Sequence, residues 1–335
     1  MALLLAFSAR AEKQTLNLFI WSEYIDPTLV ADFEKQFDCK VNIDLYEDVE
    51  SMLAKVQGGG GSLYDVVVPT DHVVTAMIKL NLLAPLRHEN IPNLKNLDAK
   101  FTSPPYDRGN KFTIAYQWGT LGVFARQTKD KPVPRTWGIF FDPSQQPGSF
   151  LLMDSPRDLI GAALKYKGHS VNSTDPKQLK EARDLIIAAK KRSLGFDGSV
   201  GAKNKVLAKS VKAAIVYSGE GVKGMAEDKG AVYFIPKEGG IIWVDNLAVL
   251  AKAPHRELAE KFINFILDPK ISARLSNFVQ YSSPNKAAKE FIRPEDSKNP
   301  AIYPPPEIMS RLEFLEDLGS KMRLYDEIWT QVKAK

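Results

Sequence analysis

Strand-length apolar segments alternate with helix-length amphipathic segments near the start of the chain, and this alternation constrains the fold more than any other feature. Residues 15–21 (TLNLFIW) and 65–69 (DVVVP) are nearly continuous apolar runs, as expected of strands buried on both faces. Residues 40–46 alternate apolar and polar side chains like a third strand. Because parallel strands need helical crossovers, the β-α-β-α-β order predicts a parallel sheet with helices on both faces.

Helix signals fill both gaps between these strands. Asp26-Pro27 supplies an N-cap followed by a proline at the first helical position. The apolar residues after it fall on one helical face: Leu29, Val30, Phe33 and Phe37. A second helix is indicated by Met52, Leu53 and Val56.

The rest of the chain continues the alternation, so we expect an α/β protein. Predicted strands are 150–153, 213–217, 231–235 and 241–250. Predicted helices lie near 159–166, 176–191, 202–209 and 255–267, the last capped by Asp268-Pro269. A length of 335 residues predicts about two domains, and the run 241–250 (IIWVDNLAVL) is long enough to cross between two lobes.

Composition and motifs exclude several function classes. The net charge of +5 is too small and too mixed to indicate a nucleic-acid partner. The basic stretch 177–212 is best interpreted as a solvated helix face, with a polyanion-binding patch as the alternative. No stretch has the ~18 uncharged apolar residues of a membrane span.

Signals for metals, cofactors and catalysis are missing from the sequence. Cys39 is the only cysteine, and the four histidines have no ligand-spaced partners. The tetraglycine 58–61 has no Lys-Ser/Thr after it, and Ser218-Gly219-Glu220-Gly221 is not a nucleophile elbow. We therefore expect no metal, no cofactor and no catalytic residues.

The N-terminus predicts export. Residues 2–7 form a short apolar run, and Ala9-Arg10-Ala11 has the small-x-small form of a signal-peptidase site. We interpret residues 1–11 as a signal-peptide remnant, with a buried N-terminal strand as the alternative.

An aromatic residue stands near a carboxylate at two predicted strand ends and in the predicted crossover: Trp21-Ser22-Glu23-Tyr24, Tyr217-Ser218-Gly219-Glu220 and Trp243-Val244-Asp245. Ligands of open α/β sheets bind outside the carboxyl ends of the strands, so these clusters could face one cleft. A carboxylate beside an aromatic ring suits a protonated amine. Taken singly, each aromatic could be a core residue and each acid a surface residue.

Five ordered segments carry a family resemblance: LFIWSEYIDPTLVADFEKQF, YDVVVPT, IPKEGGIIWVDNLAV, YSSPNKAA and NPAIYPPPEI. They resemble the bacterial periplasmic polyamine-binding proteins (putrescine or spermidine) that serve ABC importers, from about Leu16 to Lys333. The resemblance implies a two-lobed type II periplasmic-binding-protein fold. Each lobe would be a mainly parallel sheet flanked by helices.

The resemblance also implies how such a receptor works. Lobe one would comprise residues 12–121 and 246–290, and lobe two residues 122–245 and 291–335. A monomer would close its interlobe cleft on a protonated polyamine in the periplasm and deliver it to an inner-membrane permease.

Thirteen positions are expected to line the cleft. By resemblance, Thr70 supplies a small hydroxyl and Asp245 pairs with a ligand amine. The remaining positions are Trp21, Ser22, Glu23, Tyr24, His72, Ser155, Asp158, Tyr217, Glu220, Trp243 and Tyr281.

Departures from the family pattern leave the ligand open. Spermidine-preferring members have two acids where this chain has Ser155 and Asp158, so one carboxylate is missing. His72 and Tyr217 replace other aromatics of the spermidine type, and Glu220 stands where putrescine-preferring members have an acid. The alternatives are another cationic amine, an iron or anion solute on the same fold, and a secreted enzyme with paired carboxylates.

Overall fold

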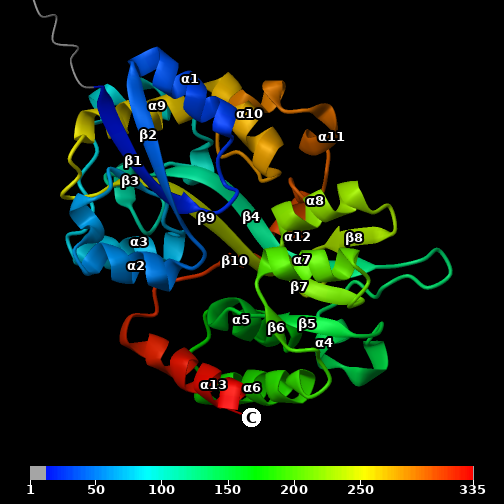
Figure 1. Ribbon diagram of the computed structural model, residues 1–335. Coiled ribbons are helices and arrows are strands. Elements are labelled where there is room, and N and C mark those ends of the chain that lie inside the picture. Colours follow the sequence, from blue (N-terminus) through cyan, green and yellow to red (C-terminus); the bar gives the residue numbers. More distant parts are fainter. Residues whose placement is uncertain (1–12, 335) are drawn as a thin grey trace, which may run out of the picture.

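A computed structural model describes residues 13–334. Two α/β lobes lie one above the other in Figure 1, and two long strands, β4 (Thr113–Arg126) and β9 (Gly240–Val249), run between them. The two-lobed α/β architecture expected from the sequence is confirmed. The interpretation of residues 1–11 as a signal-peptide remnant lies outside the described residues.

The first lobe is built on β1 (Gln14–Trp21), which pairs in parallel with β2 (Cys39–Tyr46) and with β3 (Val66–Val67). The sheet continues through β9, antiparallel to β3. Its helices are α1 (Pro27–Phe37), α2 (Val49–Gln57), α3 (Asp71–Lys79), α9 (Arg256–Ile266) and α10 (Pro269–Val279). The predicted β-α-β-α-β order is confirmed, although β3 is shorter than predicted.

Side chains of β1 alternate between two cores. Leu18 and Ile20 are buried with residues of α1 and α9, whereas Phe19 is buried with Met52 of α2 on the opposite face. Asp26 caps α1 as predicted, because its side chain accepts a hydrogen bond of 2.8 Å from the Thr28 amide. This arrangement leaves the carboxyl end of β1 at the sheet edge that faces the second lobe.

The second lobe has a mixed sheet and its own helices. β5 (Phe150–Met153) is parallel to β6 (Phe196–Asp197) and to β7 (Ala213–Tyr217). β7 and β8 (Ala231–Phe234) flank the C-terminal half of β4, both antiparallel to it. The helices are α4 (Gly138–Phe141), α5 (Pro156–Tyr166), α6 (Pro176–Lys190), α7 (Ser199–Leu207), α8 (Ser218–Glu227) and α13 (Met322–Ala334).

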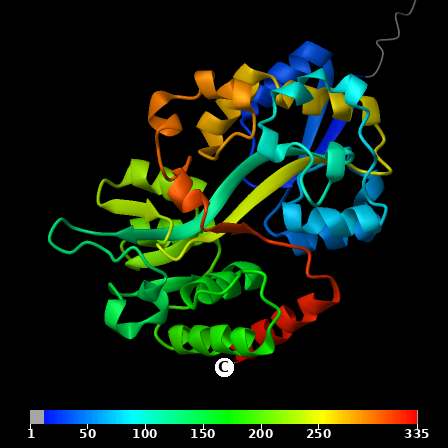
Figure 2. The same cartoon turned by 180° about the vertical axis from the view of Figure 1, so that it is seen from behind.

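The C-terminal segment returns from the first lobe to the second. α11 (Pro294–Ser297), α12 (Pro306–Met309) and β10 (Leu312–Phe314) precede α13, and β10 pairs in parallel with β9. The end of the chain then lies beside α6, as Figures 1 and 2 show.

β4 and β9 are shared by both lobes. They pair antiparallel from Thr113–Ala248 to Thr120–Ile242, with a register shift between Ala115 and Gln117. Figure 2 shows both strands from behind as they pass between the lobes. The predicted crossing of residues 241–250 is therefore confirmed by β9.

The structure departs from the sequence patterns most clearly at β4, which they do not predict, and at the predicted cap Asp268-Pro269. β4 contains two glycines, and glycine disfavours strands. Glycine is nevertheless needed at position 119, because a Cβ there would lie only 2.5 Å from Cζ2 of Trp243. Asp268-Pro269 does not cap the predicted helix 255–267. Asp268 instead N-caps the following helix, α10, by accepting hydrogen bonds from the amides of Lys270 (2.9 Å) and Ile271 (3.3 Å).

No helix within residues 13–334 combines the length and the apolar character that crossing a bilayer requires.

The start of β4 is held by one buried carboxylate. Asp107 is 4% exposed and accepts hydrogen bonds from three backbone amides, those of Lys111 (3.1 Å), Phe112 (2.9 Å) and Thr113 (2.7 Å). It also accepts a bond of 2.8 Å from the Thr113 hydroxyl. These bonds fix the turn through which the chain enters the crossing strand.

Asp107→Ala should lower the free energy of unfolding by about 3 kcal/mol, because it leaves buried backbone donors without an acceptor. Urea unfolding measures the loss. The control is Asp98→Ala, which removes a cap that accepts a single 3.2 Å bond from Lys100 and should lose about 1 kcal/mol. Equal losses in the two variants would contradict this role of Asp107.

Candidate ligand-binding site

A cavity of about 430 Å³ lies between the lobes, and all thirteen positions expected to line the cleft border it. The first lobe contributes the ends of β1 and β3, and the second contributes the ends of β5 and β7. This is the carboxyl-end location expected for α/β sheets. The geometry brings the predicted residues together, while their contact with a ligand stays a prediction.

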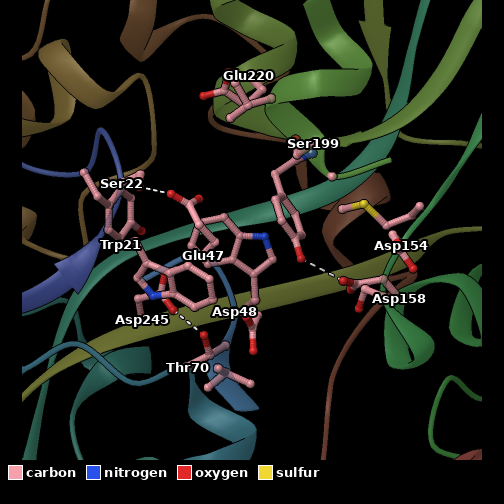
Figure 3. A pocket seen from close by; sticks show the side chains of 18 of the residues that line it. Trp21, Ser22, Glu47, Asp48, Thr70, Asp154, Asp158, Ser199, Glu220 and Asp245 are labelled. Atoms are coloured by element: carbon pink, nitrogen blue, oxygen red, sulfur yellow. Dashed lines mark hydrogen bonds between the residues drawn. The ribbon is translucent and has the colours of Figure 1, made fainter. Parts of the chain in front are cut away.

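Asp245 of β9 forms one end of the pocket, and Figure 3 shows it beside Thr70. Its side chain is 6% exposed and accepts a hydrogen bond of 2.6 Å from the Thr70 hydroxyl. Burial raises the pKa of Asp245 to about 7, against the hydrogen bond from Thr70, which lowers it. Among residues 13–334 no lysine or arginine forms an ion pair with Asp245, and the charge of nearby His72 lowers the pKa less than burial raises it.

A second buried acid, Asp71, lies next to the end of the pocket that Asp245 forms. Asp71 is 1% exposed, and its carboxylate accepts hydrogen bonds from the amides of His72 (2.8 Å) and Val244 (3.3 Å). Burial also raises the pKa of Asp71. Asp71 therefore ties the start of α3 to β9 directly behind the pocket.

Aromatic rings form a continuous wall across both lobes. Tyr281 lies edge-on to Tyr24 at 5.6 Å and to Trp243 at 5.0 Å between ring centroids, and Trp243 lies edge-on to Tyr217 at 5.8 Å. Trp21 also borders the cavity, and its indole nitrogen donates a hydrogen bond to the Val68 carbonyl at 3.1 Å. Such rings cover methylene groups and attract cations.

Local backbone geometry places Tyr281 in this wall. Gln280 ends α10 in the left-handed conformation (φ 62°), which turns the next residue toward the pocket. The ring then meets α8 of the second lobe at Gly219, where a Cβ would lie only 2.4 Å from Cζ of Tyr281. Glycine is required there for the two lobes to approach.

Asp158 is a buried acid that α5 of the second lobe contributes to the pocket. It is 5% exposed on the first turn of α5, and its Oδ2 accepts a hydrogen bond of 2.7 Å from the Tyr217 hydroxyl, drawn dashed in Figure 3. Burial raises the pKa of Asp158, and the bond from Tyr217 opposes the rise. Ser155 is the N-cap residue of the same helix and also borders the cavity.

Glu220 differs from the other acids because lysines surround it. Its Oε1 accepts a hydrogen bond of 3.0 Å from Lys223, and Lys203 lies 3.0 Å from its Oε2 without the alignment of a hydrogen bond. Lys223 also lies 3.7 Å from Oε2 of Glu23, which belongs to the first lobe. Neither lysine is among the predicted positions: Lys203 meets Glu220 only when α7 packs on α8, whereas Lys223 follows Glu220 by three residues on α8 itself.

Several further residues border the cavity without having been predicted. Glu47 and Asp48 follow β2, and Asp154 follows β5. The aromatic-beside-carboxylate pattern used for Trp21 would have found Glu47 and Asp48, which follow Tyr46, but not Asp154, which follows Met153. Ser22 donates a hydrogen bond to Glu47, and Asp154 pairs with Lys333 of α13 at 2.5 Å.

Polar atoms that face the cavity are not all satisfied by the protein. Among residues 13–334, the buried indole nitrogen of Trp243 has no hydrogen-bond partner. Within the same described range, no three His, Cys, Asp or Glu side chains are grouped so that they could hold a metal ion.

Residues 28–305 match the family of bacterial extracellular solute-binding proteins. The chain belongs to this family. Members bind solutes and do not form an enzyme class. The pocket between the lobes is therefore the candidate solute site of a receptor.

Individual relatives cover nearly the whole chain. The putrescine/cadaverine-binding protein of Pseudomonas aeruginosa is 34% identical over 100% of this chain and 98% of its own length. The spermidine/putrescine-binding periplasmic protein of Escherichia coli is 31% identical over 96% of this chain and 92% of its own. Among solved structures, the spermidine/putrescine ABC transporter substrate-binding protein of Streptococcus pneumoniae superposes with a TM-score of 0.84 at 30% identity, over 96% and 99% of the two chains.

Asp245→Asn should stabilise the ligand-free protein at high pH. The folded state binds the Asp245 proton more tightly than the unfolded chain, so the wild type loses stability as pH rises from about 4 to about 7. The loss amounts to about 4 kcal/mol at most. Asparagine carries no such charge, so the variant should be more stable than the wild type at pH 8 and similar to it near pH 4.

Urea unfolding at both pH values measures this difference. Asp130→Asn, in the exposed loop after β4, is the control and should follow the wild type at each pH. A wild type and an Asp245→Asn variant with parallel pH profiles would mean that Asp245 is ionised at no cost in the folded protein.

Proposed function

We propose that this protein is an extracytoplasmic receptor that binds a protonated polyamine between its lobes and delivers it to an ABC permease. The observation that carries the proposal is the buried carboxyl of Asp245, hydrogen-bonded by the neutral Thr70 hydroxyl and placed under an aromatic wall. A ligand ammonium would supply the positive partner that this acid lacks.

The chemistry of the pocket fits an alkylammonium. A cation over an aromatic face gains about 0.5 to 2 kcal/mol, and a hydrogen bond to a carboxylate contributes about 1.5 to 3 kcal/mol. Trp243 and Tyr281 present rings between the acids, so they would cover the methylenes of a linear amine. The names of the relatives from Pseudomonas aeruginosa and Escherichia coli, which include putrescine, cadaverine and spermidine, support the same ligand class.

An anion is a poorer fit to this pocket. Arg157 borders the cavity, but its guanidinium donates to the Glu316 carbonyl (3.0 Å) and to Oδ1 of Asn172 (2.8 Å). Buried acids such as Asp158 and Asp245 would repel an anionic solute. The family membership speaks against the secreted enzyme with paired carboxylates.

The cellular setting follows from the same relatives. We propose a periplasmic location, since the Escherichia coli relative is named a periplasmic protein, with an inner-membrane permease as partner and a monomeric state.

We also propose that the lobes divide within the crossing strands, near 121/122 and 245/246. The C-terminal boundary at 290/291 is better moved toward β10. Residues 291–298 contact α10, because the Arg293 amide donates to Oδ1 of Asn277 (3.2 Å) and Gln280 donates to Oδ2 of Asp296 (3.3 Å). The chain then reaches the second lobe only after this segment.

Calorimetric titration with unmodified putrescine tests the function. We expect one binding site per chain and no chemical change in the amine. Asp245→Ala should weaken binding about 30-fold or more, because removing one partner leaves the ligand ammonium buried and unpaired. Asp32→Ala removes a surface acid that pairs with Arg274, and it should bind like the wild type.

One result would contradict the assignment of Asp245, and another would contradict the proposed function. Normal binding by Asp245→Ala would overturn the assignment of this acid. A wild type that binds no polyamine, or that converts putrescine to a product, would overturn the proposed function.

A further inference from the structure

One end of the pocket already contains ammonium groups of the protein itself. Lys223 donates to Glu220 at 3.0 Å and lies 3.7 Å from Glu23, while Lys203 lies 3.0 Å from the other oxygen of Glu220. The formal charges of these two lysines and two glutamates cancel. Figure 3 shows Glu220 at the opposite end of the drawn pocket from Asp245 and Thr70.

Lys223 stands between two acids that are both expected to contact a ligand. Glu23 follows β1 in the first lobe, whereas Glu220 and Lys223 lie one turn apart on α8 in the second lobe. The lysine ammonium therefore bridges one acid of each lobe.

The other two buried acids that line the pocket, Asp245 and Asp158, have no such partner. The Asp245 carboxylate accepts from the Thr70 hydroxyl at 2.6 Å, and the Asp158 carboxylate accepts from the Tyr217 hydroxyl at 2.7 Å. Within residues 13–334, neither carboxylate forms an ion pair with a lysine or arginine at 4 Å or less. The pocket thus offers two buried acids to a ligand and has already neutralised the third, Glu220.

We propose that Lys223 determines ligand specificity by acting as an internal competitor for the third ammonium of a triamine. The inference rests on the proposed polyamine function. A diamine such as putrescine can place its two ammonium groups at Asp245 and Asp158. Within the buried part of the pocket, a triamine such as spermidine must either displace Lys223 from Glu220 or hold its third charge beside the lysine ammonium, and both are unfavourable.

Lys223 is the group that can make this discrimination, and Lys203 is not. The side chain of Lys203 is 9% exposed beneath Glu220, so it is fixed by packing. The side chain of Lys223 is 23% exposed and borders the cavity, so its ammonium can be removed by substitution without opening the core.

The test is the ratio of putrescine and spermidine dissociation constants in Lys223→Met. Methionine keeps the unbranched apolar stem and removes the charge. We expect spermidine binding to strengthen relative to putrescine by about tenfold or more, because Glu220 and Glu23 then accept the third ammonium. Lys223→Arg keeps the charge and should keep the wild-type ratio.

Lys205→Met is the matched control. Lys205 pairs with Asp197 at 2.7 Å on α7, and its side chain is 52% exposed outside the pocket. It removes the same charge from the same lobe, so it should leave the ratio unchanged. Lys223→Gln repeats the test if the methionine variant does not fold, as judged by circular dichroism.

The outcomes separate the two proposals. A Lys223→Met or Lys223→Gln ratio within about twofold of wild type, with putrescine still bound by the wild type, would overturn the role of Lys223 and leave the proposed function standing. A shift of similar size in Lys205→Met would also overturn it, since the effect would then be general electrostatics. If the wild type binds neither amine, the proposed function fails first and the role of Lys223 with it.

Discussion

The antiparallel pairing of β4 with β9 is the interaction on which the rest of the structure depends. Both strands are shared by the two lobes, so their pairing fixes how the carboxyl ends of β1 and β7 face each other. Asp245 lies on β9 itself, opposite Gln117 at the register shift. The side chain of Gln117 is fully buried, and neither of its polar atoms has a partner within the described part of the chain. Asp245 is thus part of the element that joins the lobes, so a ligand bound to it, as proposed, would act directly on that junction.

The pocket is electrostatically asymmetric. At the β9 end, burial raises the pKa values of Asp245 and Asp71, and the only ion pair that either acid forms within the described residues is that of Asp71 with the His72 ring at 3.7 Å. At the α8 end, Glu220 is equally buried but is compensated by Lys203 and Lys223. A linear cation can therefore gain most at the first end, where its charge relieves the cost of burying an acid. The aromatic wall between the ends is apolar, as a methylene chain requires.

Much of the fold could be predicted because its signals are local. The strands 150–153 and 213–217 are short apolar runs whose ends match β5 and β7, and the Asp26-Pro27 cap depends only on neighbouring residues. β4 could not be predicted, because its glycines make sense only once the Trp243 ring lies against Gly119. The predicted role of Asp268-Pro269 as the end of helix 255–267 is wrong, because an Asp-Pro pair also marks the start of the next helix.

The candidate site, like the fold, has residues that the sequence predicts and residues that it does not. The strand-end clusters identified Trp21, Glu220 and Asp245 from the residues alone, whereas Thr70 and Ser155 came from the family resemblance. Lys203 could not be predicted, because nothing in its own helix indicates the carboxylate that it meets after folding. Lys223 stands three residues after Glu220 on α8, so this ion pair could have been predicted from the helical spacing.

The central claim is that a ligand ammonium replaces the missing positive partner of Asp245. A crystal structure of the protein with putrescine tests it most directly. The account predicts one ammonium within about 3 Å of the Asp245 carboxylate and the other at Asp158, with the methylenes against Trp243. A putrescine bound elsewhere, or bound in the cavity with both ammonium groups away from Asp245, would contradict it.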